Sequence, residues 1–171
     1  MTNKKTLFTQ IIAVIALLAT LSISAQQSTE IEPEFSPMPA QTNVQANEDG
    51  VAIDGFDPVA YFDDGKAVKG LEVHSCEYLN KTWHFSSAEN RDKFLSNPEK
   101  FSPQYGGYCA HSIGKNKLVE SNPEAFSIRD DKLYLYVNNS QATKDSKRNE
   151  TKFKFNKTKR DSNWLTYQSD F

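Results

Sequence analysis

The chain has 171 residues, of which 37% are hydrophobic and 25% charged, and its formal net charge is -2. This composition excludes collagen-like, wholly disordered and polytopic membrane proteins. The nearly balanced charge provides no general attraction to nucleic acid, so no nucleic acid partner is expected.

The N-terminus has the pattern of a secretory signal peptide. Two lysines precede the apolar run "IIAVIALLATLSI", and small residues in "SISAQQ" offer a cleavage site after Ala25. The apolar run is shorter than the ~20 residues of a full membrane span. We therefore predict a cleaved signal at residues 1–25, with an uncleaved membrane anchor as the alternative. The mature protein is expected outside the cytoplasm, where a disulfide can form.

Residues 26–48 are rich in Gln, Pro, Ser and Glu and show little apolar periodicity. They predict a flexible linker, or simply a disordered tail. The folded domain is predicted to occupy residues 49–171.

Two β-hairpins are predicted within this domain. The first covers residues 71–87 with a turn at Asn80–Lys81, and the second follows "FSIRDDKLYLYVN" with a turn at Asp130–Asp131. In the second hairpin Tyr134 and Tyr136 should face one way. The other face should carry Leu133, Leu135 and Val137.

A helix is predicted between the hairpins. Ser86 and Glu89 form a capping box at its start, Phe94 and Leu95 lie on its buried face, and Pro98 limits its end. Strands, a helix and strands again indicate an α+β fold, a small antiparallel sheet of two hairpins packed with short helices.

The C-terminal tail, residues 140–163, is basic and predicted to be partly helical. Its cations suit an ordinary solvated helix face, or a surface for an acidic partner or anionic lipid. Trp164, Leu165 and Tyr167 are predicted to hold the end of the chain on the core.

The stretch "PQYGGYCAHSIG", residues 103–114, combines one of two cysteines with one of three histidines. Cys109 follows a glycine pair, and a helix ending at Gly114 would place it in the first turn, where a thiolate is favoured. Cys109 is then a soft metal ligand or a redox thiol, and the alternative is a buried small hydrophobe. His111 is a second candidate ligand, or a surface residue.

His74 and Cys76 repeat this pattern in reverse, on one face of a predicted strand. Two cysteines and two histidines suit zinc or Cu(I) if both pairs meet in space. A disulfide between Cys76 and Cys109, closing a loop of about 30 residues, is one alternative, and unrelated cysteines are another. No catalytic triad order, phosphate loop, HExxH or CxxC is present, which favours a role without catalysis.

Three stretches, "GFDPVAYF", "KTWHFSSAENRDKFLSNPEKFSPQYGGYCA" and "DKLYLY", resemble the YHS domain-containing proteins. The closer resemblance is to an exported bacterial group with the motif "YGGYCA", and it runs from about Val51 to Trp164. It implies a small α+β fold and a metal role, because related YHS domains accompany copper-transporting ATPases and heavy-metal handling proteins. Short YHS domains carry cysteines in "DPVCG" and "YFCS", where this chain has Ala60 and Ser86. Cys109 matches the cysteine of the exported group.

Together these observations predict an exported, monomeric YHS-type domain, in the bacterial periplasm or secreted, that binds copper, with zinc as the other ion considered. Cys109 is the main predicted ligand, assisted by His111, His74 and Cys76. The protein would buffer the ion or pass it to a membrane metal transporter or another envelope protein. It would touch the membrane only through an uncleaved signal segment. The alternatives are a thiol redox protein that uses Cys109 with Cys76 as resolving thiol, and a non-catalytic interaction module.

Overall fold

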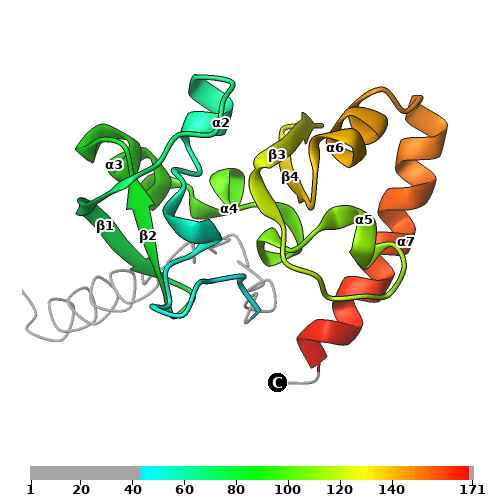
Figure 1. Cartoon of the computed structure of the whole chain (residues 1–171), viewed down its shortest axis with the longest axis horizontal. Coiled ribbons are helices and arrows are strands. Elements are labelled where there is room, and N and C mark those ends of the chain that lie inside the picture. Colours follow the sequence, from blue (N-terminus) through cyan, green and yellow to red (C-terminus); the bar gives the residue numbers. More distant parts are fainter. Residues whose placement is uncertain (1–42, 170–171) are drawn as a thin grey trace, which may run out of the picture. The chain divides into compact units, whose positions relative to one another are not determined.

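The structure is a computed structural model that describes residues 43–169 (Figure 1). The predicted signal peptide and residues 26–42 of the predicted linker lie outside the described residues. The described elements, in chain order, are η1 (Ile53–Gly55), α2 (Ala60–Asp63), β1 (Leu71–Tyr78), β2 (Lys81–Phe85), α3 (Ala88–Ser96), α4 (Pro98–Phe101), η2 (Gln104–Gly107), α5 (Ala110–Ile113), β3 (Asn122–Arg129), β4 (Lys132–Tyr136), α6 (Asn139–Ser146) and α7 (Glu150–Ser169). Within residues 43–169, no helix combines the length and apolar character needed to cross a membrane.

The predicted α+β fold is confirmed, with two separate antiparallel sheets of two strands each, β1–β2 and β3–β4. The second hairpin turns at Asp130–Asp131, as predicted, and both residues have positive φ, as a two-residue type I′ turn requires. The first hairpin turns one residue earlier than predicted. Tyr78 pairs with Lys81, so Leu79 and Asn80 form the turn with φ of 53° and 57°.

Helix α3 begins one residue later than its predicted cap. The Ser87 side chain, not that of Ser86, accepts a hydrogen bond from the Asn90 N–H at 3.1 Å. Only Phe94 of this helix is buried, and Leu95 is 52% exposed, so the predicted apolar face is narrower than the spacing indicated. Helix α3 stops at Ser96, as Pro98 predicted, and Pro98 opens the next helix.

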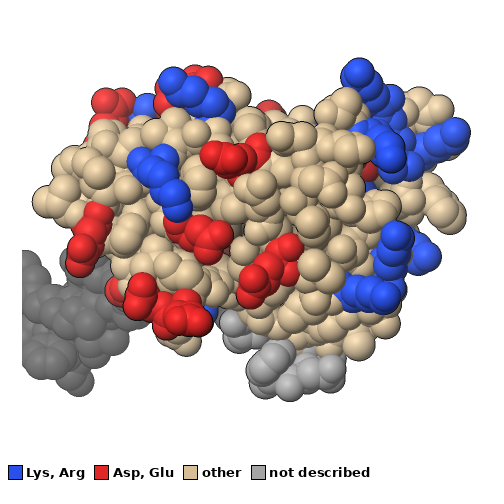
Figure 2. All heavy atoms as spheres, viewed as in Figure 1, with Lys and Arg blue, Asp and Glu red and all other residues tan. Residues whose placement is uncertain are grey.

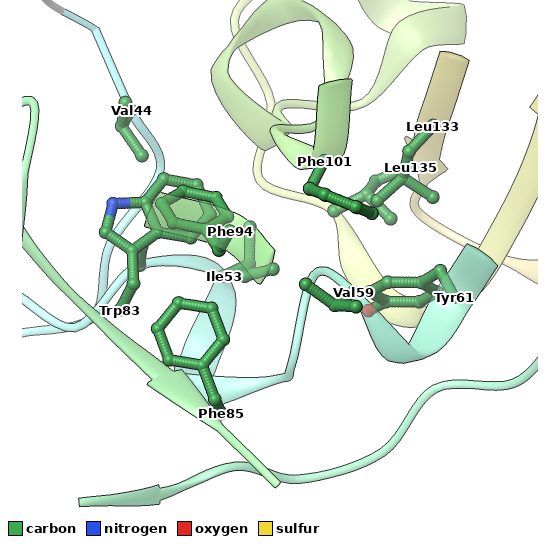
Figure 3. Close-up of a cluster of buried hydrophobic side chains, with 11 residues drawn as sticks. Val44, Ile53, Val59, Tyr61, Trp83, Phe85, Phe94, Phe101, Leu133 and Leu135 are labelled. Carbon is green, nitrogen blue, oxygen red and sulfur yellow. The ribbon is translucent and has the colours of Figure 1, made fainter. Parts of the chain in front are cut away.

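The first of two clusters of buried side chains packs β2, α3, α4 and the loops around η1 and α2 (Figure 3). Trp83, Phe85 and Phe94 form its aromatic centre, with ring centroids 5.2 Å apart for both the Trp83–Phe94 and the Phe85–Phe94 pair. Tilted contacts of this kind stabilise a core beyond the burial of apolar area. The remaining buried members are Val44, Ala52, Ile53, Val59, Tyr61, Phe101, Leu133 and Leu135.

The second cluster lies around α5, α6 and α7 and contains Trp164, Tyr105, Phe153 and Cys109. Trp164 is buried here, as predicted, while the neighbouring Leu165 is exposed and does not hold the end of the chain. The long helix α7 therefore packs on the molecule through one face.

The hairpin β3–β4 belongs to both clusters. Leu133 and Leu135 lie in the first cluster, and Tyr134 and Tyr136 lie in the second. This is the alternation that the sequence predicted. Because both faces of strand β4 are buried, the strand joins the two clusters.

Candidate functional site around Cys109

The glycine pair before Cys109 forms a turn in the left-handed region. Tyr105, Gly106 and Gly107 have φ of 59°, 58° and 86°. A Cβ on Gly106 would lie 1.9 Å from the backbone oxygen of Asn43, and one on Gly107 would lie 2.8 Å from Ile53 Cγ2. Both glycines are required here, because no side chain fits between these neighbours.

The segment packed against this turn comes from the predicted linker. Val44 is 5% exposed and lies in the first cluster, and the Gln45 N–H donates to the Gly106 carbonyl at 2.8 Å. The Gln45 side chain accepts from the Ser121 N–H at 2.8 Å, and the Ser121 hydroxyl donates to the Gly107 carbonyl at 2.7 Å. Residues 43–48 are thus part of the fold, and these bonds hold both sides of the turn that leads to Cys109.

Cys109 is the N-cap residue of α5 and does not lie in its first turn. Its N–H donates to the Val119 carbonyl at 2.9 Å, and its carbonyl accepts from Ser112 and Ile113. Its side chain is 0% exposed, and the thiol donates to Gln141 Oε1 at 3.4 Å. Helix α5 has only four residues. The sequence predicted that the dipole of this helix would favour a thiolate at Cys109, but the dipole of a four-residue helix is small.

His111 lies two residues further, within α5, and is half-buried. Burial lowers its pKa below the ordinary value, and the positive charges of Lys115, Arg160 and Arg148 lower it further against the opposing effect of Asp145. The imidazole is therefore neutral at neutral pH, which is the form that binds a metal.

The other two predicted ligands, His74 and Cys76, lie on β1 and are half-buried. Cys76 pairs with Trp83 across the hairpin and packs against the first cluster. Burial raises the pKa of its thiol, helped by the charge of Glu77 and opposed by Arg91. Cys76 is therefore a protonated thiol at neutral pH.

The structure keeps the two predicted pairs on separate elements. Cys76 contacts the first cluster and Cys109 belongs to the second, and both cysteines are free. Within residues 43–169, no group of three or more His, Cys, Asp or Glu side chains is placed to hold a metal ion. The described residues therefore do not fit a four-ligand site of the kind that structural zinc requires.

Sequence reasoning missed the most densely bonded polar side chain of the domain, that of Asp57. This buried carboxylate accepts from the N–H groups of Val59 and Ala60 through Oδ1. Its Oδ2 accepts from the N–H and hydroxyl of Ser86, at 2.8 and 2.6 Å, and from the Asn90 amide at 2.7 Å. An Asp directly before Pro58 and a helical turn is the available signal for such a cap.

Comparison with known proteins supports one family. The family model of the YHS domain matches residues 59–105, from the start of α2 to η2. Comparisons with curated proteins and with solved structures found no match. His74 and Cys76 lie inside the matched stretch, and Cys109 and His111 follow it. Residues 59–105 of this chain are therefore similar to the YHS domain family.

Proposed function

We propose that this protein is an exported, non-catalytic YHS-type domain whose cargo is a soft metal ion, in the first instance Cu(I). The family match supports a metal role, because YHS domains are linked to copper and heavy-metal handling. Export follows from the predicted signal peptide. Cys109 is the proposed thiolate ligand and His111 the proposed second ligand.

The observation that carries the proposal is that a cysteine, the N-cap residue Cys109, and a neutral histidine, His111 in α5, lie two residues apart in the chain. A thiolate selects soft ions such as Cu(I), and imidazole also suits copper. Cu(I) accepts as few as two ligands, whereas a structural zinc site takes four. With no larger group of ligands among residues 43–169, the donor set favours Cu(I) over zinc. His74 and Cys76 lie on a different element, β1, and we leave them outside the proposed site.

The test is a Cu(I) titration of the reduced protein against a competing chelator, with the free thiols counted first. We expect two free thiols and one tightly bound ion per chain. Binding should be lost in Cys109→Ser, weakened in His111→Asn and retained in Cys76→Ser, which is the matched control. The circular dichroism spectrum of each variant reports whether it remains folded. Because His111 is only half-buried, His111→Asn should fold, and it still tests the site if Cys109→Ser does not fold.

Two outcomes would overturn the proposal. One is copper binding that survives in both Cys109→Ser and His111→Asn, and the other is no uptake of copper by a folded wild-type protein with two free thiols. Loss of binding in Cys76→Ser alone would transfer the site to the β1 pair.

A non-catalytic interaction module is the second candidate. The observation that favours it is the complete burial of the Cys109 side chain, which is how an inert packing cysteine behaves. In that case the thiol of folded Cys109 should resist alkylation, and copper should not bind.

The thiol redox alternative has less support. A resolving thiol must reach its partner, and Cys76 and Cys109 belong to different clusters. The raised pKa of Cys76 also leaves it a poor nucleophile at neutral pH.

A further inference from the structure

The two parts of the described chain carry opposite net charge. Residues 138–169 contain eight Lys and Arg against three Asp and Glu, whereas residues 43–137 contain ten against 15. Figure 2 shows Lys and Arg gathered on the side of α7, with most of the Asp and Glu of this face away from it. The segment that contains α6 and α7 thus has a net positive charge, whereas the rest of the described chain has a net negative charge.

An open hollow lies where α6 ends and α7 begins, with a volume of about 470 Å³. No acidic side chain lines it. Its lining residues are Lys144, Lys147, Arg148, Asn149 and Lys152. We call this the basic hollow.

The carboxylates nearest to the basic hollow in sequence are already occupied. Asp145 is buried and pairs with Arg160 and Arg148, and Glu150 pairs with Arg129 and Lys154. The three lysines of the hollow are exposed and form no ion pair within residues 43–169. Their charge is therefore available to an anion from outside the molecule.

An apolar side chain lies beside the hollow on the outer face of α7. Phe153 and Arg160 mark the buried face of this helix, and Phe155 is 73% exposed on the opposite face. Phe155 follows Lys152 by three residues and precedes Lys159 by four, so the three share that face. A free phosphate ion gains nothing by contact with an exposed aromatic ring. A bilayer surface presents phosphate groups above an apolar layer, so it can contact both the lysines and the ring.

We propose that the basic hollow and the outer face of α7 bind the surface of an anionic phospholipid bilayer. The lysines of the hollow would contact headgroup phosphates, and the Phe155 ring would enter the boundary between headgroups and acyl chains. This peripheral contact is independent of the proposed copper site and of the N-terminal apolar segment.

The first experiment is lysine footprinting of the full chain by acetylation and mass spectrometry. The protein is mixed with vesicles of phosphatidylcholine alone, or with vesicles of phosphatidylcholine and phosphatidylglycerol in equal parts. We expect Lys144, Lys147 and Lys152 to be protected only by the anionic vesicles. Lys66 and Lys117, which do not line the hollow, should react equally with both kinds of vesicle present. Because each molecule carries its own reference lysines, insertion of the N-terminal segment does not produce the signal.

The second experiment compares two triple variants with the same net charge. One is Lys144→Gln, Lys147→Gln and Lys152→Gln, and the control is Lys66→Gln, Lys81→Gln and Lys117→Gln. Each lysine at an anionic surface contributes a factor of about five in partitioning, so the first variant should lose on the order of 100-fold of the excess binding to anionic over neutral vesicles. The control should lose little.

A pair of single variants tests the aromatic contact. Phe155→Ser should weaken the binding to anionic vesicles about tenfold, and Leu95→Ser on helix α3 should not. The proposal is wrong if both triple variants lose binding equally, or if anionic vesicles leave the hollow lysines unprotected. It is also wrong if inorganic phosphate at the same phosphate concentration protects these lysines as well as the vesicles do, since the site then takes a small anion.

Discussion

At the scale of the residue, Asp57 shows how one buried polar side chain can join several parts of the fold. Its carboxylate accepts five hydrogen bonds, from the backbone at the start of α2, from Ser86 after β2 and from Asn90 in α3. The start of α2 and the junction of β2 with α3, about 30 residues apart in sequence, therefore meet on one buried side chain. A buried carboxylate is tolerated only when its oxygens are satisfied in this way.

Replacement of Asp57 by Ala should lower the free energy of unfolding by about 2–5 kcal/mol, because the buried N–H groups of Val59 and Ala60 lose their acceptor. Urea denaturation followed by circular dichroism measures the change. Asp63→Ala is the matched control, since Asp63 makes an exposed ion pair with Lys93 and should cost under about 1 kcal/mol. Equal effects in both variants would contradict the role given to Asp57.

At the scale of the element, a buried ion pair joins helix α7 to α6. Arg160 donates to Asp145 at 2.7 and 3.2 Å, and both side chains are almost fully buried. The Tyr136 hydroxyl also donates to Asp145 at 2.6 Å, which ties α6, α7 and β4 together. Burial alone would raise the pKa of Asp145, but the hydrogen bonds from Arg160 and Tyr136 and the charges of Arg160 and Arg148 outweigh it and lower the pKa below its ordinary value.

Arg160→Leu should therefore destabilise the protein by about 3–5 kcal/mol at neutral pH, because it leaves a buried carboxylate without its main partner. The depressed pKa of Asp145 adds stability that is present above its unfolded pKa of about 4, and that is lost as the pH falls through the lower pKa of the folded state. The difference between wild type and variant should thus shrink on acidification below about pH 4. Urea unfolding across this pH range measures the difference, with Lys154→Leu from an exposed pair as the control. A difference that does not change with pH would contradict this account.

At the scale of the molecule, the two buried clusters share strand β4. The leucines of this strand pack on the first cluster and its tyrosines on the second, and all described residues fall within one compact unit. Neither cluster can lose its packing without exposing one face of the same strand. The two clusters should therefore unfold together.

Each cluster contains one tryptophan, Trp83 in the first and Trp164 in the second. In Trp164→Phe the fluorescence reports only the first cluster, and in Trp83→Phe it reports only the second. We expect the fluorescence and circular dichroism transitions in urea to coincide within each variant. A fluorescence midpoint clearly separated from the circular dichroism midpoint in either variant would show that the clusters unfold independently.

The sequence by itself determined what short-range patterns encode. Alternation along β4 predicted which residues face which side, and the paired aspartates at 130 and 131 predicted the turn, because these features depend only on neighbours in the chain. Motifs "GFDPVAYF" and "YGGYCA" predicted the YHS family for the same reason. Weaker local signals, such as the cap of α3 and the first hairpin turn, were displaced by one residue when long-range contacts chose between equivalent positions.

Tertiary structure decided what depends on contacts between distant segments. It placed Cys76 and Cys109 in different clusters. It also brought the backbone of Asn43, 63 positions earlier, so close to Gly106 that no side chain fits at this position. It surrounded the buried Asp57 carboxylate with donors from distant residues, and it brought four lysine and arginine side chains from the junction of α6 and α7 to the lining of one hollow. None of these follows from periodicity, because burial and charge neighbourhood are set by how the elements pack together.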